Sequence, residues 1–130
     1  MTETIDYYFT PSSPYTYLAG PRFRALVKKN DLQVNYKPFD LFAAFKLTGQ
    51  KKVVDRPPQL QANRLTELKR WGAYLNMKIN LQPKFFPPNP VPAHKMIIAA
   101  QKTSSDVLDL ANAYMSACWA DDRDIGDTET

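Results

Sequence analysis

The sequence holds only one cysteine and one histidine among its 130 residues, and it has no long apolar run. Because Cys118 is alone, it cannot form an internal disulfide, which excludes a disulfide-stabilised secreted domain. His94 has no second histidine or carboxylate at ligand spacing, so we predict no metal site. No stretch reaches the about 18 apolar residues of a membrane helix, and the first ten residues do not resemble a signal peptide. These absences favour a cytoplasmic protein that does not bind membranes.

The remaining composition is that of an ordinary folded domain. Hydrophobic residues make up 44% of the chain and charged residues 23%, which is close to the average for globular proteins. A net charge of +4 arises from 17 Lys and Arg against 13 Asp and Glu. Since the basic residues are scattered and form no stripe with aromatic residues, they favour a small anionic ligand over nucleic acid.

The first 40 residues predict a β-α-β unit. Residues 4–9 are rich in β-branched and aromatic side chains, as in a strand. Ser13 and Pro14 combine a favoured N-cap with proline at the first helical position, so a helix is expected from there to about residue 30. Residues 32–39 alternate apolar and polar residues and predict a second strand. A right-handed crossover then places Ser13 at the carboxyl edge of a parallel sheet, where α/β folds bind ligands.

After residue 40 the sequence predicts only helices. Their expected ranges are 41–47 (closed by Gly49), 60–75, 93–102 and 106–119, the last capped by Ser104 or Ser105. Prolines at 57–58 and 83–92 mark two ordered loops between these helices. We therefore expect an α/β chain with a β-α-β part at 1–40 and a helical part at 41–130.

Ser13 has two interpretations. A serine at an N-cap most often serves only to stabilise the helix, by about 1 kcal/mol. At the edge of a sheet, however, a helix N-terminus also offers unpaired N–H groups and about half a positive charge, which suits a thiolate or carboxylate. The helix start alone favours the structural interpretation.

Three segments carry a resemblance to a known family. Residues 8–18 contain Tyr-Phe followed by Ser-Pro-Tyr-Thr-Tyr-Leu, residues 69–71 read Lys-Arg-Trp, and residues 119–125 begin with Trp and end with Asp-Ile. In this order they resemble 2-hydroxychromene-2-carboxylate isomerases and kappa-class glutathione transferases of the DsbA-like thioredoxin superfamily. The resemblance implies a thioredoxin-like β-α-β start, with an all-helical domain inserted after the second strand.

The resemblance also implies a glutathione site. The residue that matches Ser13 hydrogen-bonds the glutathione sulfur as thiolate; Ser12 is an alternative, but the Ser-Pro register favours Ser13, with Pro14 beside it. Gln50 follows a glycine where relatives have a Gly-Asn that contacts glutathione. Arg56 is a candidate partner for a ligand carboxylate.

The nearby Lys51 and Lys52 are further candidate partners for a ligand carboxylate. For Arg56, Lys51 and Lys52 alike, the alternative is a side chain that is simply solvated. For Gln50 the alternative is a polar loop residue.

The chain lacks the cysteines of a redox enzyme at this place. Residues 13–16 read Ser-Pro-Tyr-Thr where thioredoxin-like oxidoreductases carry Cys-x-x-Cys, which excludes dithiol exchange. Cys118 shares a helical face with apolar residues and is predicted to be an inert core residue.

Aromatic residues are candidates for the wall of a substrate pocket. The candidates are Tyr15, Trp71, Phe85, Phe86 and Trp119. Among them we expect Trp71 to lie in the core. Phe85 and Phe86, in the proline-rich loop, are candidate lid residues.

The resulting hypothesis is a glutathione-dependent isomerase of an aromatic ring-cleavage product, and relatives of this kind commonly form homodimers. One alternative is a kappa-class glutathione transferase, and another is a non-catalytic thioredoxin-like interaction module. Relatives continue to a third strand with a cis-proline turn, a fourth strand and a last helix. Since these 130 residues lack those elements, we expect a partial chain with weak or no catalysis of its own.

Overall fold

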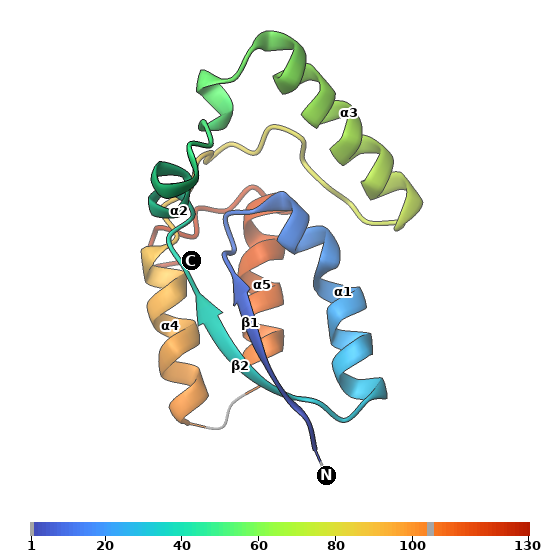
Figure 1. Cartoon of the computed structure of the whole chain (residues 1–130), viewed down its shortest axis with the longest axis vertical. Helices are drawn as coiled ribbons and strands as arrows, with labels where there is room; N and C mark the ends of the chain where they lie inside the picture. The colour runs from blue at the N-terminus through green and yellow to red at the C-terminus, as the bar shows by residue number, and fades with distance from the viewer. Residues whose placement is uncertain (1, 104–105) are drawn as a thin grey trace.

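A computed structural model describes residues 2–103 and 106–130. Strands β1 (Thr4–Phe9) and β2 (Gln33–Pro38) pair in parallel, from Thr4 opposite Gln33 to Phe9 opposite Pro38. Helix α1 (Pro14–Lys29) connects them, and both strands run toward the end of the molecule where α1 begins (Figure 1). The predicted β-α-β unit is confirmed.

Local sequence explains where α1 begins and ends. Ser13 has an extended backbone, and its Oγ accepts a hydrogen bond from the Thr16 N–H at 3.4 Å. Pro14 occupies the first helical position, where a missing N–H costs nothing. Lys28 and Lys29 lie in the last turn, where positive charge is favoured by the helix dipole.

The predicted helices are confirmed with small shifts at their ends. They are α2 (Leu41–Thr48), α3 (Pro58–Tyr74), α4 (Val91–Lys102) and α5 (Val107–Trp119), and a short 3₁₀ helix at Val53–Asp55 was not predicted. In the described ranges, no helix is both long and apolar enough to cross a membrane.

The predicted cap of α5 was wrong. Ser104 and Ser105 lie outside the described residues, and the N-cap is Asp106, whose side chain accepts from the Asp109 N–H at 3.0 Å. Aspartate is as good an N-cap as serine, and it stands closer to the apolar pattern of the helix.

Helices α4 and α5 pack against the β-α-β unit. Helix α4 contacts β2, and α5 contacts both α1 and α4 (Figure 1). One core cluster joins Phe9 of β1 to Ile97 of α4 and to Val107 and Ala111 of α5. The β-α-β unit therefore shares its core with two of the later helices, and the domain boundary at residue 40 stays a prediction.

The contact between α1 and α5 is tight at Gly20. An added Cβ at Gly20 of α1 would lie 2.6 Å from Oδ1 of Asn112 on α5. This is closer than real Cβ contacts, so a larger residue at position 20 would force the Asn112 side chain to move.

A second core cluster centres on Trp119, the last residue of α5, whose side chain is 0% exposed. Its indole Nε1 donates to the Pro11 carbonyl oxygen at 3.2 Å. Its ring meets the Phe86 ring edge-on, with centroids 5.7 Å apart. Trp119 thus joins the loop before α1 to the proline-rich loop after α3.

The prediction that Trp71 lies in the core was wrong, since this residue is 44% exposed. Helix α3 lies at one end of the molecule, away from the sheet, and contacts α1 (Figure 1). Leu68 faces the core, whereas Trp71 pairs with Tyr74 on the open side. The helical spacing was right, but it could not indicate that one face of α3 stays uncovered.

Trp119→Phe should lower the free energy of unfolding by about 2 to 4 kcal/mol, because it removes a buried donor and part of a packed ring. The matched variant Trp71→Phe should change it by less than about 0.5 kcal/mol, because its side chain is partly solvated. Urea titration followed by far-UV circular dichroism measures both values. Equal effects of the two substitutions would contradict the central place given to Trp119.

Candidate functional site

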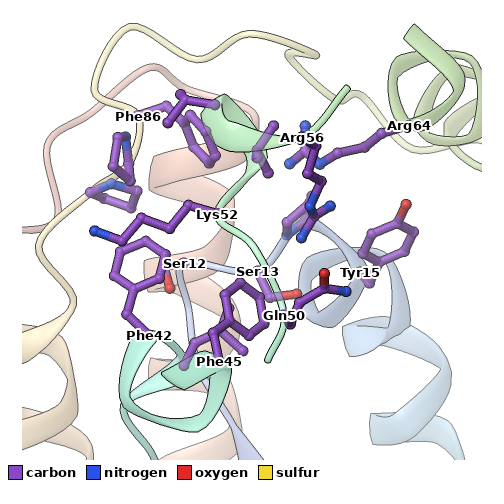
Figure 2. Close-up of a pocket in the computed structure, with 16 residues that line it drawn as sticks. Ser12, Ser13, Tyr15, Phe42, Phe45, Gln50, Lys52, Arg56, Arg64 and Phe86 are labelled. Carbon is purple, nitrogen blue, oxygen red and sulfur yellow. The ribbon is translucent and has the colours of Figure 1, made fainter. Parts of the chain in front are cut away.

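A cavity of about 490 Å³ opens beside the N-terminus of α1. It collects side chains from the β1–α1 loop, α2, the segment after α2, α3 and the proline-rich loop (Figure 2). Four predicted site residues line it: Ser13, Pro14, Gln50 and Arg56. Its size is typical of pockets for small molecules.

The Ser13 hydroxyl has its proton available for a ligand. Its Oγ already accepts the Thr16 N–H in the helix cap, so the hydroxyl proton remains for a ligand. The Tyr15 N–H is in the first turn of α1, and no acceptor for it is found among the residues that the structure describes. A hydroxyl, an N–H and the positive end of the helix dipole therefore meet at one place.

Ser12 is engaged differently from Ser13. Its Oγ lies 2.9 Å from Oγ1 of Thr10, and the same Thr10 atom lies 3.0 Å from Nε2 of His94. Thr10 is 2% exposed, so this chain of hydrogen bonds is fixed inside the fold. Since Ser12 is tied to Thr10, Ser13 has the freer hydroxyl of the two, and the choice between them as the site residue stays a prediction.

Gly49 places Gln50 in the cavity wall. Gly49 caps α2 in the left-handed conformation, with φ of 77°, which turns the chain toward Ser13. Gln50 lies beside Ser13 in Figure 2. Its Oε1 accepts the N–H of Lys51 at 2.9 Å, which leaves the side-chain NH₂ group to donate to a ligand.

The basic side chains near the site divide into two groups. Arg56 and Lys52 line the cavity, whereas Lys51 does not. Nε of Arg56 donates to the Lys51 carbonyl oxygen at 3.0 Å, and its Cζ lies 5.9 Å from the centre of the Phe45 ring. The Lys52 Nζ lies 4.7 Å from the centre of the Phe42 ring. Both cations are therefore held against aromatic rings.

The aromatic candidates are partly brought together. Tyr15 and Phe86 line the cavity, and Trp119 lies behind Phe86 in the core. Phe85 and Trp71 do not line it. A further aromatic wall was not predicted. It comes from α2, whose Phe42 and Phe45 rings both line the cavity.

Arg64 is the residue that the sequence interpretation missed. It is 8% exposed, lines the cavity and lies over the Phe86 ring, with Cζ 5.4 Å from the centroid. Burial lowers the pKa of its guanidinium from the ordinary value; the Tyr15 hydroxyl opposes this, and the charge of Arg56 adds a smaller lowering. The sequence did hold a signal for it: Arg64 stands four positions before Leu68, which places a charged residue on the buried face of α3.

The cavity is positively charged. It is lined by Lys52, Arg56 and Arg64, and of the described residues that line it none is Asp or Glu. Glu67 lies nearby but accepts a hydrogen bond from Oη of Tyr15 at 3.1 Å. Burial and this bond raise the pKa of the Tyr15 hydroxyl. The site is suited to an anion with apolar parts.

Cys118 is a core residue, as predicted. It is 1% exposed, and burial raises the pKa of its thiol to about 12, with a smaller effect from Asp122 and Asp124. Within the described residues, no group of three His, Cys, Asp or Glu side chains could hold a metal ion.

The family of the chain follows from comparison with known proteins. Residues 4–130 match the DsbA-like thioredoxin domain, so the chain belongs to this family. A curated relative, 2-hydroxychromene-2-carboxylate isomerase from Sphingobium xenophagum, is 29% identical over 87 residues. That alignment covers 65% of this chain and 44% of the relative, so the chain spans less than half of the relative's length.

A solved structure of a 2-hydroxychromene-2-carboxylate isomerase has the same fold. It superposes with a TM-score of 0.69 at 21% identity, over 97% of this chain and 60% of that one. The relatives found in both comparisons are thus isomerases, and the thioredoxin-like fold of the DsbA type with a helical part is confirmed.

The Cys118 thiol should not react with iodoacetamide in the folded chain at about pH 8, because burial keeps it protonated and shielded. In urea it should be alkylated completely, as measured by intact-protein mass spectrometry. Rapid alkylation without denaturant would show that the end of α5 is open.

Stability should decrease as the pH falls below about 6.5. Burial lowers the pKa of His94 from its ordinary 6.5, while Asp40 opposes this weakly. The unfolded chain therefore binds the proton more tightly, and the stability that neutral His94 contributes is lost at acid pH. Thermal denaturation over this pH range should show a smaller decrease for His94→Gln, which keeps an amide near Thr10. An unchanged pH profile in the variant would contradict this.

Proposed function

We propose that this site belongs to a glutathione-dependent isomerase of an aromatic ring-cleavage product, similar to 2-hydroxychromene-2-carboxylate isomerase. The observation that carries the proposal is the Ser13 hydroxyl, which accepts the Thr16 N–H, has its own proton left to donate and lines an electropositive cavity. A serine that served only as a helix cap would not need to line a cavity of this kind.

The lining residues fit glutathione. This tripeptide carries two carboxylates and one thiol, and the cavity offers three cations without a competing carboxylate among the residues lining it. Arg56 and the Gln50 amide are the proposed contacts to its peptide and carboxylate groups. Ser13 and the N–H of Tyr15 are the proposed contacts to its sulfur.

The chemistry assigned to the chain is stabilisation of a thiolate. A hydroxyl donor and the N-terminus of α1 both favour the charged form of a bound thiol, and so lower its pKa. When bound, glutathione supplies a nucleophile that adds reversibly to a conjugated substrate, which permits bond rotation and returns the cofactor unchanged. Phe42, Phe45 and Phe86 would hold the flat substrate and exclude water from it.

A kappa-class glutathione transferase is the second candidate, because it would use the same thiolate donors. The two activities differ in what leaves the site: an isomerised substrate of unchanged mass, or a lasting glutathione adduct. Mass spectrometry of the product distinguishes them. The isomerase is favoured here because the relatives reported above are isomerases.

The thiol of glutathione bound to this chain should have a pKa below its usual range, as measured by the ultraviolet absorbance of the thiolate against pH. Ser13→Ala should raise that pKa by roughly 1 to 2 units, because one charge-assisted hydrogen bond is lost. Ser12→Ala serves as the matched control and should have a much smaller effect.

An equal effect of the two serine substitutions would contradict the role given to Ser13. If calorimetry detects no glutathione binding to the wild-type chain, the interaction module that needs no thiol becomes the better account.

A further inference from the structure

Thr10 serves three hydrogen-bond partners with a single hydroxyl. Its Oγ1 accepts the Ser12 N–H at 3.4 Å, and it lies 2.9 Å from the Ser12 Oγ and 3.0 Å from Nε2 of His94. A threonine hydroxyl has one proton and two lone pairs. Because the Ser12 N–H takes one lone pair, one proton and one lone pair remain for two partners. Of the Ser12 hydroxyl and the His94 ring, therefore, one donates to Thr10 and the other accepts from it.

Two arrangements of protons satisfy these contacts. In the first, Nε2 of neutral His94 accepts the Thr10 proton, so the Ser12 hydroxyl donates to Thr10 and keeps its lone pairs for other partners. In the second, Nε2 carries a proton and donates to Thr10, so Thr10 donates to Ser12 and the Ser12 proton is released. Protonated His94 permits only the second arrangement, since both of its ring nitrogens are donors.

Ser12 connects two cavities. It lines the cavity of about 490 Å³ beside α1, and it also lines a second cavity of about 240 Å³ together with His94. Figure 2 shows Ser12 among the side chains around the first cavity. Thr10, which joins the two side chains, is 2% exposed, so the relay between them is shielded from water. A change of protonation in one cavity therefore reaches a hydroxyl in the other.

The charge of the first cavity decides between the two arrangements. Its charged lining consists of Lys52, Arg56 and Arg64, with no carboxylate from the described part of the chain. While no anion is bound, this positive potential favours a Ser12 hydroxyl that turns its lone pairs to the cavity, as in the first arrangement. A bound anion reverses the potential and favours a Ser12 proton that faces it, as in the second.

Few charged groups surround His94. Asp40, the N-cap of α2, lines the second cavity with it and raises the pKa of His94, but the larger effect of burial lowers it. On α4 itself, the neighbouring Lys95 is exposed. The β2 strand contributes Tyr36, whose hydroxyl pKa is raised mainly by burial, and α5 packs on α4 with apolar residues. His94 is therefore neutral near pH 7, and acid protonates it.

We propose that Thr10 and His94 are positioning residues, which make the Ser12 hydroxyl an acceptor in the empty cavity and a donor when an anion is bound. The two hydroxyls rotate and keep their own protons, while Nε2 of His94 gains a proton from solvent. Near pH 7 the ring releases its Nδ1 proton in exchange, and in acid it keeps both. The relay does not rest on the proposed function, whereas the identity of the anion does.

The proposal couples anion binding to proton binding. An anion in the cavity favours the arrangement with a proton on Nε2, so it raises the pKa of His94. By linkage, protonation of His94 strengthens anion binding by the same factor.

Nuclear magnetic resonance of the ring nitrogens tests the relay directly, because His94 is the only histidine of the sequence. Without ligand, the neutral ring should carry its proton on Nδ1. Thr10→Val removes the hydroxyl at nearly constant shape and should abolish this preference, whereas Thr10→Ser should retain it. Ser13→Ala, which lies outside the relay, should leave the tautomer of the ligand-free chain unchanged.

Calorimetry with glutathione sulfonate measures the coupling. A sulfonate replaces the thiol of this probe, so its charge is constant between about pH 5 and 7. The bound probe should raise the pKa of His94 by about 0.5 to 1 unit, and wild-type affinity should rise about three- to tenfold as the pH falls across this titration. At neutral pH the probe should also move the ring proton from Nδ1 to Nε2. Ser12→Ala should lose this tautomer change and keep less than about a twofold rise in affinity.

Three outcomes would overturn the relay. They are a ligand-free neutral His94 with its proton on Nε2, a folded Thr10→Val variant with the wild-type tautomer, and equal pH dependence of probe binding in the wild-type chain and Ser12→Ala. If far-UV circular dichroism shows that Thr10→Val is unfolded, the response of Ser12→Ala decides. Failure of the wild-type chain to bind glutathione sulfonate would reject the glutathione site, while an Nδ1 proton that is lost in Thr10→Val would still support the relay.

Discussion

The hydrogen bond from the Trp119 indole to the Pro11 carbonyl oxygen is the constraint on which the site depends. It joins the end of α5 to the loop that carries Ser12 and Ser13. The same indole ring packs against Phe86, on the opposite wall of the cavity. Because Trp119 is fully buried, these contacts are made in a dry and closely packed place, where they fix geometry well. One side chain thereby sets the distance between the serine hydroxyl and the aromatic wall.

The proline-rich loop is held by the same region. Oη of Tyr17 on α1 donates to the Lys78 carbonyl oxygen, and the Asn80 N–H donates to the Trp119 carbonyl oxygen at 2.7 Å. These bonds satisfy backbone and side-chain groups that would otherwise be unpaired in the interior. They also fix the stretch of chain that leads into the proline-rich loop.

The cavity combines two physical means of attracting anions. At the start of α1, the Tyr15 N–H and the helix dipole favour a small, localised negative charge. On the side of α3, a planar cation against an aromatic ring favours a carboxylate with a flat body. The cavity therefore presents the Ser13 hydroxyl with a helix N-terminus from one element and the Arg64 guanidinium from another.

The sequence predicted the features that depend on local patterns. Ser13 and Pro14 determine the start of α1 through a local signal, a helix cap followed by proline. The β-α-β order then places Ser13 at the edge of the sheet. Arg64 was missed because its place in the cavity depends on the Phe86 ring, which comes from a distant loop of the chain. The link from Ser12 to His94 through Thr10 was missed for the same reason, since Thr10 and His94 are 84 residues apart. Helical spacing placed Trp71 on a stripe, but only the packing of α3 reveals that this stripe is partly open.

The most direct test of the central claim is an experimental structure of this chain with glutathione. The account predicts that the glutathione sulfur lies within hydrogen-bonding distance of the Ser13 Oγ and the Tyr15 N–H, while Trp119 still donates to Pro11. A sulfur that lies against Ser12, or outside the cavity lined by Arg56 and Arg64, would contradict it.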